Sequence, residues 1–191
     1  MAVVLVSGAA RADPQAGRDP QQELNYEYAK LYKAVSGLRL LDELLLVKFE
    51  AKSTEQLVEQ IAAFGSRTKQ ELEDLARAHP EVKLDEDGRS KLSKESSKRQ
   101  QRDRLRSYAP GTGASGADFD RMLLLSQSAA LYQLRFRVEV MADAETSQPR
   151  RAYLRKMLRD LDRLYVQAVE LLDQHYFRQP ARTPLGKIGG E

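Results

Sequence analysis

A long apolar stretch that follows the phrase Gly116-Ala117-Asp118-Phe119-Asp120 constrains the fold more than any other part of the chain. Asp118 is expected to accept hydrogen bonds from the free amides of a first helical turn. Asp120 falls where the positive end of a helix dipole favours an acid. Apolar residues then recur every three or four positions to about Ala142, and they fall on nearly every side of the helix as far as Arg135. Such a helix needs neighbours on several sides, which predicts a bundle.

Three further helical patterns would supply those neighbours. They begin near Gln22, at Thr54 and at Pro149, and the second ends before Pro80. Their apolar stripes are, in chain order, Tyr28, Leu31, Tyr32, Val35, Leu38, Leu41, Leu45 and Phe49; Leu57, Ile61, Phe64, Thr68, Leu72 and Leu75; and Tyr153, Leu154, Met157, Leu158, Leu161, Leu164, Tyr165, Ala168, Leu171 and Leu172. We expect Leu161, and Leu131 of the organising helix, to lie in the core. Long helices with short connections predict an all-α, antiparallel four-helix bundle.

One short extra helix is expected at residues 89–106, between the second and third long helices. This segment is the most polar part of the chain, with many basic residues set against Glu95 and Asp103. Its plain interpretation is a solvated face, and its functional one is an anion-binding face for a polyanion, a lipid headgroup or an acidic protein. The residues of that face would be Lys98, Arg99, Arg102 and Arg106. Two other architectures stay open: a three-helix bundle with a detached basic arm, and a homodimer that completes the bundle between chains.

The two ends of the chain differ in character from the bundle. We predict a signal-peptide-like segment and linker at 1–21, a helical bundle domain at 22–178 and a disordered tail at 179–191. Ala10-Arg11-Ala12 follows a short apolar run and has the small-x-small form of a signal-peptidase site, although no basic residue precedes the run. We therefore expect a bacterial protein that is periplasmic or otherwise exported, with a signal peptide that begins upstream. The alternative is a weakly ordered tail.

Composition and spacing exclude several kinds of chemistry. A net charge of +3, from 31 basic and 28 acidic residues, gives no whole-molecule case for nucleic acid. The chain has no cysteine, and neither His79 nor His175 belongs to the Glu-x-x-His motif of two-metal bundles. Glu43, Glu50 and Glu139 are the candidates for inward-facing acids, and the alternative is that they are exposed, because each has basic neighbours. We predict a non-enzymatic envelope protein, a structural or interaction module with an unknown protein partner, with no catalytic residue, cofactor or bound metal.

Two phrases carry a resemblance to a known family. They are Glu71-Leu72-Glu73-Asp74-Leu75-Ala76 near the end of the second helix, and Gly116-Ala117-Asp118-Phe119-Asp120. Their order resembles the exported ferritin-like family of unknown function often labelled "predicted outer membrane protein", over roughly residues 25 to 176. The resemblance implies a ferritin-like bundle and, as a further alternative, a degenerate metal or redox bundle. Where that family usually has histidines, this chain has Gly65, Leu131 and Leu164, so no family site residue is carried over.

Overall fold

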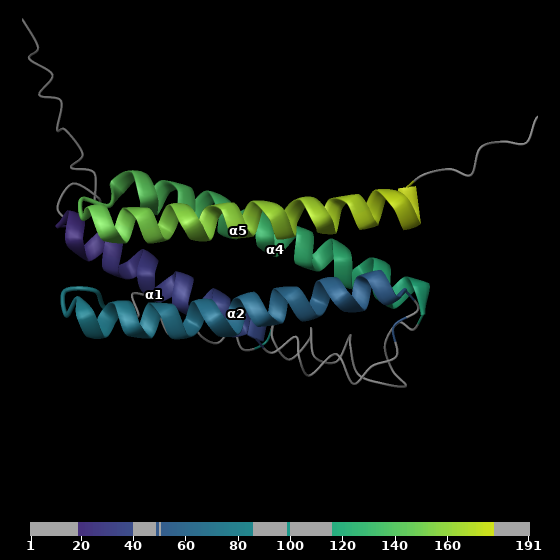
Figure 1. Ribbon diagram of the computed structural model, residues 1–191, viewed down its shortest axis with the longest axis horizontal. Coiled ribbons are helices and arrows are strands. Elements are labelled where there is room, and N and C mark those ends of the chain that lie inside the picture. The colour runs from purple at the N-terminus through teal and green to yellow at the C-terminus, as the bar shows by residue number, and fades with distance from the viewer. Residues whose placement is uncertain (1–18, 40–48, 50, 86–98, 100–115, 178–191) are drawn as a thin grey trace, which may run out of the picture.

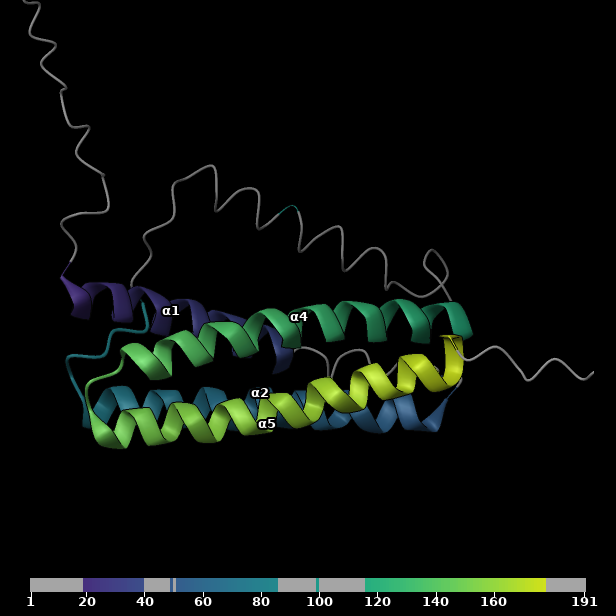
Figure 2. The same cartoon turned by 90° about the horizontal axis from the view of Figure 1, so that it is seen from above.

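Four α-helices make up the part of the protein that the computed structural model describes, residues 19–39, 49, 51–85, 99 and 116–177. The helices are α1 (Pro20–Arg39), α2 (Lys52–Ala78), α4 (Ala117–Ala144) and α5 (Gln148–Leu172). A short π-helix, η2 (Asp173–Phe177), continues α5. No strand occurs in these ranges, so the predicted all-α class is confirmed. The helices lie side by side around one apolar core (Figures 1 and 2).

The predicted apolar stripes supply most of this core. Leu131 and Leu161 are both fully buried, as expected. The α2 helix begins two residues before the predicted Thr54, and Pro149 stands in the first turn of α5. The predicted core positions Leu41 and Leu45 lie outside the described residues. Within the described ranges, none of the helices combines the length and the apolar character needed to cross a membrane.

A close approach between α1 and α2 depends on Gly65. A Cβ atom added there would lie 2.8 Å from the backbone oxygen of Val35, 2.8 Å from the backbone nitrogen of Arg39 and 2.9 Å from Cβ of Leu38. Real Cβ atoms do not approach backbone atoms so closely, so only glycine fits this crossing. The position that the resemblance aligns with a family histidine is therefore occupied here by a helix contact.

The α4 and α5 helices form a hairpin joined by residues 145–147 (Figure 2). The rings of Tyr132 and Tyr165 lie with their centroids 5.7 Å apart, and Arg135 forms an ion pair with Asp162. Moving three residues forward along α4 thus moves three residues back along α5. The contacts place the end of α4 beside the start of α5, which brings the connecting turn to one end of the bundle.

The start of α4 differs from the prediction. Gly116 is the N-cap residue with a φ of 60°, a backbone angle that favours glycine, and no side chain caps the helix. Asp118 is exposed and forms a 3.1 Å ion pair with Arg121 rather than capping the first turn. Asp120 is fully buried, and its Oδ2 atom accepts a 2.9 Å hydrogen bond from the amide of Ala51, the N-cap residue of α2. The Asp120 carboxylate therefore joins the start of α4 to the residue that precedes α2.

Among the described residues, α4 has α1 and α5 as neighbours, as a helix of a bundle should, but apolar residues on its outward side remain exposed. Leu125, Tyr132, Phe136 and Val140 keep 45%, 48%, 47% and 66% of their surface exposed. Only one side of the helix is covered by the core, because α1 and α5 flank α4 and leave its outward side open. The apolar character of that side therefore has no explanation in the packing of the described helices.

Candidate functional site

The most polar part of the interior lies at the end of the bundle where α4 turns into α5. The α4 helix ends at Ala144, and the amide of Glu145 makes its last helical hydrogen bond, 2.9 Å long, to the backbone oxygen of Met141. Glu145 then adopts an extended backbone with φ −72° and ψ 124°, and its side chain is fully buried. The turn therefore carries a carboxylate into the core.

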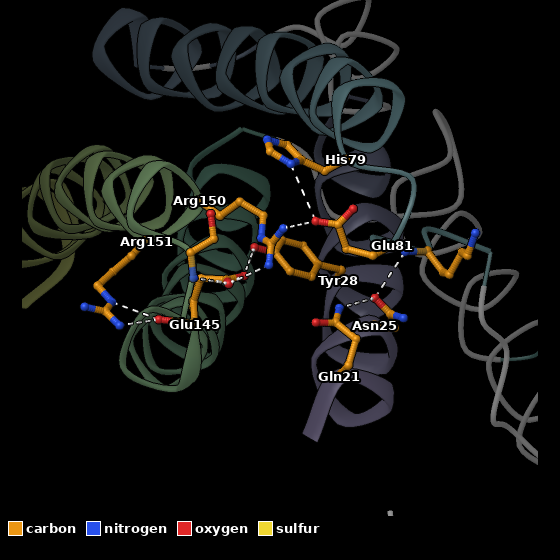
Figure 3. Close-up of polar contacts among 10 residues, drawn as sticks. Gln21, Asn25, Tyr28, His79, Glu81, Glu145, Arg150 and Arg151 are labelled. Carbon is orange, nitrogen blue, oxygen red and sulfur yellow. Dashed lines mark hydrogen bonds and ion pairs between the residues drawn. The ribbon is translucent and has the colours of Figure 1, made fainter. Parts of the chain in front are cut away.

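Three groups from different elements donate hydrogen bonds to this carboxylate (Figure 3). The Tyr28 hydroxyl, from α1, donates to Oε2 over 2.9 Å. Nη2 of Arg150, from α5, and the amide of Ser147, in the turn, each donate to Oε1 over 2.9 Å. The guanidinium of Arg151 caps the backbone oxygen of Glu145, through Nε over 2.9 Å and through Nη2 over 2.5 Å. Both side-chain oxygens of Glu145 are thereby engaged.

The environment of this cluster perturbs its ionisable groups. Burial alone would raise the pKa of the Glu145 carboxyl, but the hydrogen bonds from Arg150, Ser147 and Tyr28 together lower it below its ordinary value. Burial, and then the neighbouring Glu145 carboxylate, raise the pKa of the Tyr28 phenol far above its usual range. The hydrogen bond to Glu145 raises the pKa of the Arg150 guanidinium. The cluster therefore holds one anion, one cation and one neutral phenol.

The cluster extends to the residues that follow α2. Arg150 also forms an ion pair with Glu81, and Nδ1 of His79 lies 3.5 Å from the same Glu81 oxygen (Figure 3). The backbone amide of Glu81, and then Arg150, hold the pKa of the Glu81 carboxyl below its ordinary value. Beside them, Oδ1 of Asn25 accepts a 3.2 Å hydrogen bond from the amide of Lys83. These contacts connect α1, the end of α2 and the α4–α5 turn.

This arrangement suits structural work better than catalysis. Tyr28 and Glu145 are fully buried and Arg150 is 5% exposed, so a substrate has no path to the carboxylate. A general base must lie within reach of a substrate proton, and the buried Glu145 carboxylate is instead held by hydrogen bonds from Tyr28, Ser147 and Arg150. The cluster therefore fixes the relative positions of three chain segments.

The exposed face of α4 is the second notable feature. We define the α4 stripe as Leu125, Ala129, Tyr132, Phe136 and Val140, whose spacing of three and four residues places them along one side of the helix. All five are exposed. The rings of Tyr132 and Phe136 contact each other edge to face, with centroids 4.9 Å apart. The stripe is thus a preformed apolar surface along α4.

A cleft adjoins one end of this stripe. Its volume is about 490 Å³, and it lies between the start of α1 and the second half of α4. Phe136 and Val140 form part of its wall, and Glu23, Glu27 and Arg137 stand around it. Arg137 forms an ion pair with Glu27, so part of its charged lining is already paired within the protein.

The structure describes only some of the residues that the sequence singled out. Of the predicted anion-binding face, Lys98, Arg102 and Arg106 lie outside the described residues, and Arg99 is an exposed helical residue. That face stays a prediction. Leu131 and Leu164 are core residues. The two histidines lie at opposite ends of α2, since His79 follows its last turn and His175 lies 3.2 Å from Ser53 near its start.

Of the three candidate inward-facing acids, Glu139 is exposed, while Glu43 and Glu50 lie outside the described residues. Among the described residues, the buried acids are Asp120, which was expected near the start of a helix, and Glu145. One signal for Glu145 was its position shortly before a helix whose first turn holds Pro149, Arg150 and Arg151. Among the described residues, no group of three or more His, Cys, Asp and Glu side chains could hold a metal ion.

Comparison of the chain with protein-family models, with curated proteins and with solved structures finds no match in any of the three. The candidate site therefore consists of two features taken from the structure alone: a closed polar cluster that ties the bundle together, and an open apolar stripe on α4.

Proposed function

We propose that this protein is a non-enzymatic interaction module of the cell envelope that binds another protein through the α4 stripe. The observation that carries the proposal is the exposure of Leu125, Tyr132, Phe136 and Val140 on one side of one helix. Aromatic and large aliphatic side chains are enriched at the centres of protein interfaces, and rows of them facing water mark binding surfaces. A helix face of this kind suits a helical partner, which would bury the whole row at once.

We also infer that the bundle is antiparallel and ferritin-like in arrangement. Support comes from contacts that pair the start of one helix with the end of the next. Between α1 and α2, Tyr32 contacts Glu73, and Asn25 near the start of α1 contacts Lys83, which follows the end of α2. Between α2 and α5, Arg67 contacts Asp160, and Ser53 near the start of α2 contacts His175 in η2, which continues α5. This arrangement leaves each helix with one outward side, which on α4 is the apolar stripe.

Export remains part of the proposal, and its support is the small-x-small phrase Ala10-Arg11-Ala12 after an apolar run. Fractionation of native cells tests it. The protein should be recovered in the extracytoplasmic fraction, and recovery with the cytoplasmic proteins would contradict this part of the proposal.

Photo-cross-linking in native cells tests the interaction role. A photoreactive amino acid replaces Ala129, in the centre of the stripe, and in a matched strain it replaces Ala63, an exposed alanine of α2. We expect a discrete protein adduct from residue 129 and none from residue 63. Equal cross-linking at the two positions, or none at residue 129, would contradict the proposed function.

A further inference from the structure

We propose that the partner bound by the α4 stripe is a second copy of the same chain, whose α4 helix packs antiparallel to the first. The inference rests on the proposed function, because it names the occupant of the same surface. It follows from the spacing of the side chains along the stripe. When a second copy of the helix runs in the opposite direction, its stripe residues lie opposite those of the first copy.

The match centres between Tyr132 and Gln133. Leu125 lies as many residues before this midpoint as Val140 lies after it, and the same holds for Ala129 and Phe136. A twofold axis there sets Leu125 against Val140 of the second copy, and it sets the small side chain of Ala129 against the ring of Phe136. A two-fold interface is isologous, so each contact occurs twice. Alternation of small and large side chains lets two helices interdigitate.

Charged residues near the ends of the stripe follow the same symmetry. Arg121 precedes the stripe and Asp143 follows it, and both are exposed. The reversed pairing brings Arg121 of one copy to within one residue of the position opposite Asp143 of the other. Arg121 already forms a 3.1 Å ion pair with Asp118, so its guanidinium would be shared between two carboxylates at the edge of the interface. In the antiparallel dimer, each end of the apolar stripe therefore has Arg121 of one copy near Asp143 of the other.

A parallel arrangement lacks these matches. It would set Phe136 against Phe136 and leave Ala129 facing Ala129. It would also bring Arg121 beside Arg121 and Asp143 beside Asp143, and like charges at an interface oppose association. The other two arginines of α4 form ion pairs within the bundle, Arg135 with Asp162 and Arg137 with Glu27. The charges of Arg121 and Asp143 therefore favour the antiparallel orientation.

Cysteine cross-linking of the purified full chain tests the orientation, because the chain has no cysteine of its own. A short bis-maleimide should link Tyr132→Cys to its own copy, since this residue lies at the midpoint. Leu125→Cys should not link to itself, because two such residues would lie about 22 Å apart along the helices. A mixture of Leu125→Cys and Val140→Cys should form the mixed dimer. Self-linking of Leu125→Cys, or no linking of Tyr132→Cys, would overturn the antiparallel arrangement.

Charge exchange gives a second test of the same pairing. Arg121→Asp and Asp143→Arg should each raise the dimer dissociation constant, by about tenfold or more, because each sets like charges together. The double variant restores opposite charges and should regain most of the affinity. Failure of the double variant to recover, with helical content and melting temperature unchanged in all three proteins, would contradict the proposed contact.

Light scattering of the purified protein completes the test. The wild type and the Ala63→Glu variant should be dimers, and Ala129→Glu should be a monomer with an unchanged circular-dichroism spectrum. A monomeric wild type would overturn the inference. A lower melting temperature of the monomeric Ala129→Glu variant would also overturn it, because the stripe would then be covered by other residues of the same chain. The adduct formed in cells at residue 129 separates the two proposals. An adduct of twice the chain mass supports the second copy, whereas another mass refutes it and leaves the interaction role standing.

Discussion

The phenolic hydroxyl of Tyr28 donates a hydrogen bond of 2.9 Å to Oε2 of Glu145, a residue 117 positions later in the chain. This contact joins the first described helix to the turn between the last two (Figure 3). Both side chains are fully buried, so neither can exchange its partner for water. Removal of one partner of a buried hydrogen bond lowers the free energy of unfolding by more than the intact bond contributes, because the other partner is left buried and unpaired.

Removal of the Tyr28 hydroxyl should therefore destabilise the fold. Tyr28→Phe keeps the ring in the core and leaves Oε2 of Glu145 without its donor, which should lower the free energy of unfolding by about 1–3 kcal/mol. Urea denaturation followed by circular dichroism measures the change. Tyr26→Phe is the matched control on the same helix, because Tyr26 is only partly buried. A loss in Tyr26→Phe as large as that in Tyr28→Phe would contradict a specific role for the hydrogen bond.

Acid should weaken the fold through Glu145. Its folded-state pKa lies below the ordinary value of 4.5, so the unfolded chain takes up a proton more readily than the folded protein. The stabilisation from this group is therefore full above pH 4.5 and is lost as the pH falls through the folded-state pKa. Melting temperatures measured from pH 7 to pH 3 should show Glu145→Gln below the wild type at neutral pH, with the difference shrinking below about pH 4.5.

Glu139→Gln is the control for this pH profile, because Glu139 is an exposed carboxylate on α4, the helix that ends directly before Glu145. Its melting temperature should follow the wild type across the whole range. A constant difference between Glu145→Gln and the wild type at every pH would show that the charge of Glu145 contributes nothing.

The two described helical glycines of α1 and α2 should respond in opposite directions to alanine. Gly65→Ala forces a Cβ atom against the α1 backbone at 2.8 Å, and overpacking of this kind should cost about 1–3 kcal/mol. Gly37→Ala adds a Cβ with nothing within 4 Å, so its better helix propensity should stabilise the protein by up to about 1 kcal/mol. Urea denaturation of both variants measures the two changes. Stabilisation in both would show that α1 and α2 lie further apart than described.

Burial predicts the cost of truncating leucines on α5. Leu161 is fully buried, so Leu161→Ala should lower the free energy of unfolding by about 2–5 kcal/mol. Leu158, one turn earlier, is only partly buried, and Leu158→Ala should cost clearly less. Chemical denaturation of the two variants measures the difference. Equal losses would contradict the orientation of α5 about its axis.

The helices themselves could be predicted from the sequence because their causes are local. The recurrence of apolar residues at three and four positions placed Leu131 and Leu161 in the core, and proline placed the start of α5 and the end of α2. Each of these signals depends on residues within one or two turns of each other. The absence of cysteine was likewise readable without any fold.

Only the tertiary structure decided which acids are buried and which apolar side chains are left outside. Glu139 lies in an apolar helix and is exposed, whereas Glu145 lies in a turn and is fully buried. The difference comes from Tyr28 and Arg150, which reach Glu145 from two other helices. The stripe from Leu125 to Val140 is as apolar as a core face, and it is exposed because α1 and α5 flank α4 and leave that side open. Such outcomes depend on contacts between distant parts of the chain, which periodicity along one helix does not encode.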